Sequence, residues 1–507
     1  MNRTVIIVGA GPVGLLLACE LRLHNVETIV LESRLEPGTR PCGLAINAAT
    51  VELLDQREVM ESIRTVGREF PGAHFAGLPL DPVNLPERHS FSLFVNQSQL
   101  EHRLEEYALK LGADVRRGHE FRSLEQDEEG VAVSVIAPSG AYTTRCRYLV
   151  GCDGSASTVR ETAGIDFPGV ESPLHGIVGD LEAEPGATHY LYVGGEHCER
   201  GTFTLLPVGG GALRIIVCEF DAEPPGRDED PTLAELETLV QRLTGLELSL
   251  GRPRWLARWY NVTRQAQQYR SGAVFLAGDA AHVHFPLNGS ALNTGLEDAM
   301  NLGWKLAADL NGRARTDLLD TYHTERHPVG ARAGSVNRAQ VALMHPLQHI
   351  APLREIFQEL TQLAEVNEYL VMLAGGLEVR YMPEDEPAPA HPLVGRRLVN
   401  ATLRAATGET TVARVLYPGR GVLLDLSGGN RPAPDVAGWA DQVDVVTAEP
   451  TAEIPAVRVL LRPDGRVAWA LASEEPTPNN ADLPDAGLHA ALTMWFGAQA
   501  DVVDTAS

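Results

Sequence analysis

The chain of 507 residues is longer than one hydrophobic core usually supports, so we expect two or three domains. Its hydrophobic fraction of 44% and charged fraction of 21% are typical of a soluble globular protein. The formal net charge of −25, with no cluster of Lys and Arg among aromatic residues, argues against a nucleic-acid partner.

The first predicted element is a strand–helix–strand unit. Thr4 to Val8 is a β-branched run, residues 12–23 have a helical pattern, and residues 27–31 are again β-rich. Glycines interrupt this apolar stretch, so it does not read as a signal peptide. No other stretch has the about 18 consecutive apolar residues of a membrane span. We therefore expect a cytoplasmic protein with no membrane partner.

A glycine-rich turn, GAGPVG at residues 9–14, joins the first strand to the helix, which is the context of a dinucleotide fingerprint. Gly9 permits the tight turn, Gly11 lets the backbone approach a pyrophosphate, and Gly14 lets helix and strand pack closely. Pro12 opens the helix, whose N-terminal N–H groups favour an anion. The sequence predicts a phosphate-binding loop here.

A carboxylate at the end of the second strand completes this prediction. Glu32 is placed to accept both ribose hydroxyls of an ADP moiety and would repel a 2′-phosphate, so NADP is disfavoured at this site. Ser33 and Arg34 follow directly and belong to the same predicted site. These residues alone leave FAD and NAD open.

The middle of the chain changes character. After a predicted helix at 97–111 and strands at 131–136 and 148–151, residues 176–265 form strands separated by turn clusters, with a hairpin turn at 209–211. We expect an antiparallel sheet with one face on the core and one available to a ligand. Five apolar residues alternate there and are expected mainly in the core, with some lining an apolar pocket: Phe203, Leu205, Ile215, Val217 and Phe220.

A further strand at 273–277 and a long helix at 292–310 imply that the chain returns to the first domain. Residues 382–392, rich in Pro and acid, are typical of a linker. The predicted domains are a discontinuous cofactor domain (1–175 and 266–345), a sheet domain (176–265), a helical segment and linker (346–390) and a C-terminal domain (391–507).

Two internal motifs extend the cofactor prediction. CDGSASTVR at 152–160 and FLAGDAAH at 275–282 each follow a strand, and both resemble fingerprints of the flavoprotein aromatic hydroxylases, the single-component FAD monooxygenases. The resemblance implies that Asp279, beside Gly278, accepts from the ribityl chain of FAD. It also implies that Asp153 and Arg160 assist binding of FAD and of transient NAD(P)H. FAD is thus the expected resident cofactor.

The resemblance covers nearly the whole chain. Gln97 matches the family's glutamine near the flavin. Residues 74–81 resemble a stretch that is typical of hydroxylases from actinobacterial polyketide pathways. The loop expected to face the flavin ring contributes Pro286, Gly289, Ala291, Leu292 and Asn293. The implied fold is α/β, with a Rossmann-like FAD-binding domain of the glutathione-reductase type, an inserted antiparallel sheet and a C-terminal thioredoxin-like domain. That last domain has no cysteine, which favours a packing role or support of a dimer.

The sequence departs from the family beside the flavin. Cys42 and Ala49 stand where members usually carry arginine, and the loop reads PLNGSALN where members usually have two consecutive glycines and a third further on. Ala291 adds a Cβ where a backbone N–H is expected to approach the ring. Loss of positive charge there disfavours an anionic reduced flavin.

Two functions follow as hypotheses. The first is an FAD-dependent monooxygenase that hydroxylates an aromatic polyketide, or performs Baeyer–Villiger oxidation, through a flavin hydroperoxide with NAD(P)H as reductant. The alternative is a non-redox Diels–Alder-type cyclase that forms a dialkyldecalin from a polyene in spirotetronate or tetramate biosynthesis, with FAD as a structural element. The altered loop favours the cyclase; the retained Asp153 and Arg160 favour the hydroxylase, which ranks first.

No catalytic residue is predicted, and the substrate is expected to be a small molecule. His282 and His284 alternate on an extended segment but have no third ligand at a recognisable spacing, so no metal site is predicted. A monomer and a homodimer both remain open.

Overall fold

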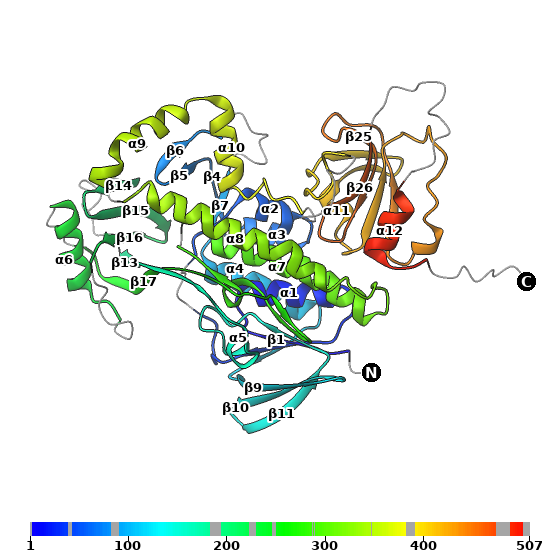
Figure 1. The fold of residues 1–507 in the computed structure, drawn as a ribbon, viewed down its shortest axis with the longest axis horizontal. Helices are drawn as coiled ribbons and strands as arrows, with labels where there is room; N and C mark the ends of the chain where they lie inside the picture. Colours follow the sequence, from blue (N-terminus) through cyan, green and yellow to red (C-terminus); the bar gives the residue numbers. More distant parts are fainter. Residues whose placement is uncertain are drawn as a thin grey trace, which may run out of the picture.

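The computed structural model shows three parts side by side, with a helical layer in the centre (Figure 1). It describes residues 3–38, 43–82, 91–182, 194–222, 230–245, 250–285, 287, 289–345, 347–381, 391–472 and 487–499. The mixed α/β class predicted from the sequence is confirmed. In the described part of the chain, no helix is both long and apolar enough to cross a membrane.

The central part contains a six-stranded sheet, which is parallel except for one edge strand. Its order is β18 (Arg270–Ser271), β19 (Val274–Leu276), β12 (Tyr148–Gly151), β1 (Val5–Val8), β2 (Thr28–Glu32) and β8 (Asp114–Arg117). Strands β1, β2, β12 and β19 are buried throughout, as expected for a parallel sheet covered on both faces. The strands predicted near 4–8, 27–31, 148–151 and 273–277 are therefore confirmed.

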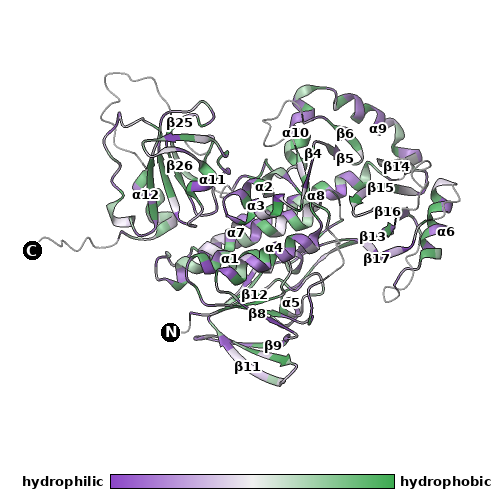
Figure 2. Cartoon of the chain, turned by 180° about the vertical axis from the view of Figure 1, so that it is seen from behind, coloured by the Kyte–Doolittle hydropathy of each residue, from purple (hydrophilic) through white to green (hydrophobic). Residues whose placement is uncertain are grey.

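Helices cover one face of this sheet. Helix α1 (Pro12–Leu23) packs against both α4 (Gln97–Lys110) and α7 (Ser290–Leu310), and α7 in turn contacts α8 (Asp320–Ala342). The other side carries a three-stranded sheet of β9 (Glu120–Asp127), β10 (Gly130–Ala137) and β11 (Gly140–Cys146). Figure 2 shows α1 and α4 side by side from behind. The helices expected at 97–111 and 292–310 match α4 and α7.

The second part is a six-stranded sheet. Its order is β14 (Gly194–Cys198), β15 (Gly201–Gly209), β16 (Ala212–Phe220), β13 (Gly169–Glu182), β17 (Pro253–Gln265) and β20 (His282–Val283). All its pairings are antiparallel, as predicted. Residues 209–211 make the predicted hairpin turn, with three glycines at positive φ.

Helix α6 (Leu233–Thr244) covers one face of this sheet and determines which side chains form its core. Of the five alternating apolar residues, four pack under α6: Phe203, Leu205, Ile215 and Val217. Phe220 packs elsewhere, with Phe75 and Phe285. The expectation that some of these residues line a ligand pocket is wrong for this set. The four residues under α6 lie on the face opposite the cavity described below, and Phe220, although on the same face of β16 as Ile216, is not among the residues that line it.

Short elements close the space between the two sheets. They are β3 (Ala45–Ile46), α2 (Ala48–Asp55), α3 (Val59–Arg64), β4 (Arg68–Phe70), β5 (Ala73–Phe75), β6 (Leu78–Leu80), β7 (Ser92–Phe94), α9 (Leu347–Leu360) and α10 (Ala364–Ala374). Helix α10 packs on β5 and β6.

The third part is C-terminal and has its own apolar clusters. A four-stranded mixed sheet runs β24 (Val443–Thr447), β23 (Gly421–Asp425), β25 (Ala456–Leu461) and β26 (Val467–Ala472). A hairpin of β21 (Thr402–Ala405) and β22 (Gly408–Thr411), with α11 (Val412–Val415) and α12 (Leu488–Phe496), flanks it. Of the predicted linker 382–392, residues 382–390 lie outside the described residues.

Candidate functional site

The glycine-rich turn between β1 and α1 has the geometry that a bound pyrophosphate needs. Gly9 has φ of +106°, and a Cβ on it would lie 2.3 Å from the Cys152 carbonyl oxygen. A Cβ on Gly14 would lie 2.1 Å from the Gly9 oxygen, so only glycine lets the helix approach the strand this closely. A Cβ on Gly11 would meet no atom within 4 Å. Gly11 therefore faces open space at the N-terminus of α1, which begins at Pro12.

Glu32 at the end of β2 is buried and hydrogen-bonded to this turn. One carboxylate oxygen accepts from the Ala10 N–H at 3.0 Å, and the other accepts from the backbone and side chain of Arg34. Burial opposes ionisation, but these hydrogen bonds outweigh it and hold the pKa of Glu32 below its ordinary value. Ser33 and Arg34 are exposed beside it. Sequence reasoning missed the bond to Ala10, which fixes the turn to β2.

The two internal motifs meet in space. Asp153 accepts hydrogen bonds from the Ser157 hydroxyl and from the Val159 N–H in the first turn of α5 (Thr158–Thr162), whose N-cap is Ser157. Arg160 donates to the Ser155 oxygen at 2.9 Å and to the Ala280 oxygen at 3.0 Å. Arg160 thus ties the first motif to the second. Burial raises the pKa of Asp153 and lowers that of Arg160.

The second motif forms a short turn, η3 (Gly278–Ala280), directly after β19. Gly278 has φ of +62°, and its N–H donates to a carboxylate oxygen of Asp298 on α7 at 3.1 Å. Asp298 also accepts from His282 and Arg326, each at 2.7 Å. The Asp279 side chain is exposed and has no hydrogen bond to any described residue, so it is available to a ligand.

Asp298 was not predicted as a site residue. It is fully buried on α7, and Arg326 and His282 keep its pKa below the ordinary value against the opposing effect of burial. A charged residue on the apolar face of a predicted helix is the sequence signal that could have found it. His282 is engaged by Asp298, and burial lowers the pKa of His284 to about 3, so His284 is neutral.

The loop before α7 supplies the remaining predicted residues. Gly289 has φ of +65°, and a Cβ there would lie 2.7 Å from the Ala45 oxygen. The Asn293 side chain donates to the Gly289 oxygen at 2.9 Å and accepts from the Asn47 N–H at 3.0 Å, so it joins α7 to the segment before α2. Ala291 and Leu292 lie half-buried in the first turn of α7. Pro286 lies outside the described residues.

Gln97 and Ala49 flank this loop. The Gln97 side-chain oxygen accepts from the Gly43 N–H at 3.0 Å, so it positions the chain just after Cys42, itself outside the described residues. Ala49 is buried, and its N–H donates to the Gly375 oxygen in the turn after α10. The small side chain of Ala49 lets this turn pack on α2, since a Cβ added to Gly376 would lie only 3.4 Å from the Ala49 Cβ.

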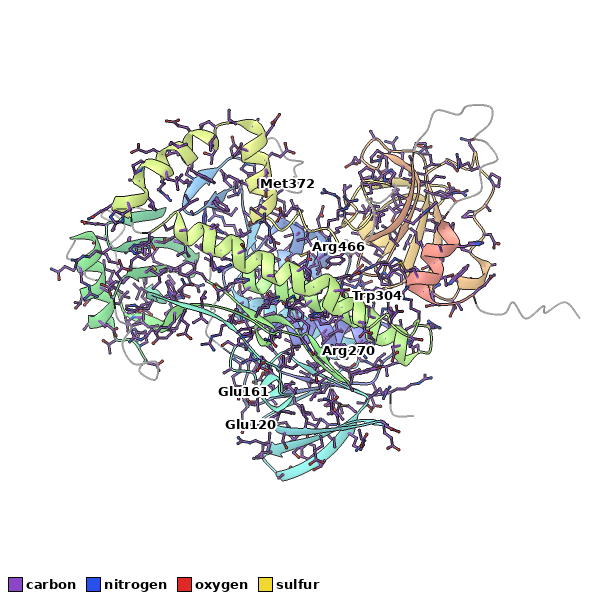
Figure 3. The ribbon with its side chains drawn as sticks, in the orientation of Figure 1. Glu120, Glu161, Arg270, Trp304, Met372 and Arg466 are labelled. Atoms are coloured by element: carbon purple, nitrogen blue, oxygen red, sulfur yellow. The ribbon has the colours of Figure 1, made fainter. Side chains whose placement is uncertain are left out.

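A cavity of about 270 Å³ adjoins the loop and Gly43. Its described lining is largely apolar and comes from residues 43–48, 70–74 and 91–94, from the end of α10, and from Val178, Leu206, Arg214 and Ile216 of the antiparallel sheet. Arg214 is paired with Asp180. Burial lowers the pKa of His74, which also lines the cavity, so that imidazole is neutral. Figure 3 labels Met372 of α10, which lies above the central helices in this view.

The described residues fit FAD. The turn at Gly11 and the helix terminus behind it suit a pyrophosphate, and the exposed Asp279 suits a hydroxylated chain. The cavity next to Gly289 suits an apolar small molecule beside the flavin.

Comparison with known families agrees with this geometry. The FAD binding domain family matches residues 2–336, and the aromatic-ring hydroxylase C-terminal family matches residues 391–499.

Individual relatives have two kinds of activity in their names. The chain is 47% identical to a dialkyldecalin synthase from Streptomyces rugosporus over 99% of this chain and 100% of the relative. It is similar to the structure of a Diels–Alderase of pyrroindomycin biosynthesis, at 46% identity and a TM-score of 0.86 over 98% and 100% of the two chains. It is also similar to the anhydrotetracycline hydroxylase of Streptomyces rimosus, at 40% identity and a TM-score of 0.89 over 99% and 100%.

Proposed function

Because this chain belongs to the family of FAD-binding aromatic-ring hydroxylases, we propose that it is an FAD-containing enzyme acting on a polyketide-type intermediate of natural-product biosynthesis. Gly9, Gly11 and Gly14 would hold the pyrophosphate, Glu32 the adenosine ribose and Asp279 the ribityl chain. Gln97, Gly289 and the first turn of α7 would border the flavin. The relatives named above, which include polyketide-tailoring enzymes, support this proposal.

The finer architecture belongs to the same proposal. The cofactor domain would be of the glutathione-reductase type and comprise 1–175 and 266–345, with the sheet domain at 176–265. The C-terminal residues 391–507 would be thioredoxin-like, which the four-stranded mixed sheet with flanking helices supports. We also propose that the protein is cytoplasmic and is either a monomer or a homodimer.

For the reaction, we favour a non-redox Diels–Alder-type cyclisation of a polyene over hydroxylation. The observation that carries this choice is the 47% identity to a dialkyldecalin synthase over the whole chain. The cavity is consistent with it: of its described lining residues, only Arg214 is a cation, and Asp180 neutralises it. Ala49 and the altered loop before α7 also favour the cyclase, because a redox flavin site needs positive charge and a closely approaching backbone N–H beside the ring.

A cyclisation of this kind needs a shaped cavity rather than an acid or a base. The apolar walls from β13, β15, β16 and α10 would fold the polyene so that its diene and alkene approach each other. Orientation of two reacting groups can contribute about 7–11 kcal/mol to rate. The FAD beside the cavity would then be a structural wall.

Hydroxylation is the second candidate, and a specific observation favours it. Asp153 and Arg160, which the family resemblance connects with NAD(P)H, are retained and tied to η3. In this reading FAD supplies redox and oxygen chemistry, NAD(P)H is the reductant, and the cavity walls position an aromatic ring and exclude water.

Anaerobic spectroscopy and turnover separate the two candidates. For the cyclase, NADH or NADPH added to the yellow holoenzyme without oxygen should leave the flavin absorbance unchanged, and a linear polyene substrate should still be converted. Rapid bleaching of the flavin by NAD(P)H, with oxygen consumed in step with product, would instead establish the hydroxylase. Ala291→Gly provides a matched test of the loop, since removing that Cβ should ease approach of the backbone to the ring.

A further inference from the structure

A row of four side chains crosses the antiparallel sheet beneath the cavity. Leu206 on β15 lies opposite Arg214 on β16, which lies opposite Asp180 on β13. Asp180 in turn lies opposite Trp255 on β17. Side chains directly opposite in neighbouring strands lie on the same face. Leu206 and Arg214 line the cavity, so this row lies on the face that α6 does not cover.

Asp180 and Trp255 hold the Arg214 guanidinium in one orientation. Nε and Nη2 of Arg214 donate to the two Asp180 oxygens at 2.7 and 3.0 Å, and the Trp255 indole N–H donates to Asp180 at 2.8 Å. The guanidinium carbon lies 5.1 Å from the centroid of the Trp255 ring. A bidentate pair supported by an aromatic ring is a rigid arrangement.

One nitrogen of this group has no partner. Arg214 is 1% exposed, and its Nη1 makes no hydrogen bond within the described part of the chain. Because the carboxylate occupies the edge formed by Nε and Nη2, Nη1 is directed away from Asp180. A buried N–H group without an acceptor is costly, and native proteins rarely leave one. An acceptor from a bound molecule would satisfy it.

Charge balance limits what that acceptor is. The Arg214–Asp180 pair is neutral as a whole, and His74, the other titratable group in the described lining, is neutral because burial lowers its pKa. A carboxylate brought into this apolar cavity would therefore lack a compensating charge. A carbonyl oxygen needs only a hydrogen bond.

We propose that Arg214 is a substrate-binding residue whose Nη1 donates a hydrogen bond to a carbonyl oxygen of an otherwise apolar, uncharged substrate. This rests on the proposed function, since it requires the cavity to be the substrate site. The bond fixes which end of the substrate lies against the sheet. Val178, Leu206 and Ile216 surround the rest of the molecule with apolar contacts.

Two probes of equal size test the proposal by equilibrium dialysis with the holoenzyme. They are the bicyclic ketone 1-tetralone and the hydrocarbon tetralin, which lacks the carbonyl. The variant Arg214→Met/Asp180→Asn removes the ion pair but keeps an acceptor for Trp255. We expect it to bind tetralone about 10- to 100-fold more weakly than the unmodified protein, with tetralin affinity unchanged, as for a lost hydrogen bond to a charged group.

The matched control is Arg258→Met/Glu235→Gln. Arg258 and Glu235 form a similar bidentate pair on the α6 side of the same sheet, so this variant should bind both probes normally. Unchanged tetralone affinity in the Arg214 variant would overturn the proposal. Tighter binding of tetralin than of tetralone by the unmodified protein would also overturn it, because partitioning into an apolar cavity alone favours the hydrocarbon. This second test does not require the variant to fold. Failure of both probes to bind at all would count against the cavity, and thus against this part of the proposed function, whereas the anaerobic assay tests the reaction separately.

Discussion

Gly9, Gly11 and Gly14 are glycines for different physical reasons. At Gly9 and Gly14 a side chain would collide with backbone oxygens of this chain, so the fold itself requires glycine. At Gly11 the backbone has φ of −77°, which any residue adopts, and a Cβ would meet nothing within 4 Å. The described part of the chain thus does not itself require glycine there, which is consistent with the pyrophosphate that we propose for this turn.

Gly11→Leu should therefore fold normally and purify without FAD, because its side chain would occupy the place of the pyrophosphate. The flavin content of the purified protein and its thermal unfolding after FAD removal measure the two halves of this expectation. Gly14→Ala is the comparison: its Cβ would lie 2.1 Å from the Gly9 oxygen, so it should lower the unfolding temperature. Full flavin occupancy in Gly11→Leu would show that the phosphate lies elsewhere.

Sequence motifs predicted which residues border the site but not what their side chains bind. Glu32 was expected to accept from a ribose, and it also accepts from the Ala10 N–H. Asn293 was expected in the loop whose backbone faces the flavin, and its side chain also bridges Gly289 and Asn47. The Asn47 partner is 246 positions away in the chain. Contacts over such a separation depend on the folded topology, which no local pattern contains.

At the scale of elements, alternation predicted the antiparallel sheet correctly but not which of its faces lines the cavity. Leu205 and Ile215 were candidates for the pocket, yet the residues that line the cavity are the next ones along each strand, Leu206 and Ile216, which point to the opposite face. Alternation of side chains along a strand assigns residues to two faces of the sheet, but it does not show which face another element covers. Helix α6, absent from the sequence-based predictions, covers the first face and leaves the second to the cavity.

Helix α7 positions the turn that carries Asp279, because Asp298 on this helix accepts a hydrogen bond from the Gly278 N–H of the turn. Asp298→Asn should weaken FAD binding by about tenfold, because the Gly278 N–H and the Arg326 guanidinium lose a charged acceptor. Fluorescence titration of the flavin-free protein measures the affinity. Asp309→Asn, on the same helix but bonded to Tyr148, should leave the affinity unchanged. Equal affinities in the two variants would mean that α7 does not position the ribityl site through Asp298.

At the scale of the whole molecule, buried ion pairs join the C-terminal part to the central helices. Glu297 on α7 accepts from Arg397 at 3.1 Å and Arg466 at 2.9 Å, and Glu325 on α8 is paired with Arg462. Figure 3 shows Arg466 and Trp304 at this junction. The sequence predicted a separate C-terminal module, but a local pattern does not reveal ion pairs between residues a hundred or more positions apart. The C-terminal part and the cofactor part should therefore unfold together.

This junction predicts a specific sensitivity to acid. Burial raises the pKa of Glu297, but Arg466, Arg397 and Arg326 outweigh it and lower the pKa from 4.5 to about 2; Arg462 and Lys305 depress that of Glu325 further. A carboxylate whose pKa is lower in the folded protein stabilises it fully above the unfolded value of 4.5, and this contribution is lost as the pH falls from 4.5 towards about 2.

Urea unfolding followed between pH 7 and pH 3 measures this contribution as a falling midpoint. Glu297→Gln should be less stable than the unmodified protein at pH 7, because three buried guanidinium groups lose a shared charge, and its midpoint should fall less steeply below pH 4.5. Glu182→Gln, which removes an exposed pair with Arg252, should reproduce the pH dependence of the unmodified protein. If the curves for Glu297→Gln and the unmodified protein ran parallel down to pH 3, Glu297 would not be the group that links acid to release of the C-terminal part. A steeper curve for Glu297→Gln would contradict the expected sign, because the substitution removes a proton-binding group that favours folding only when ionised.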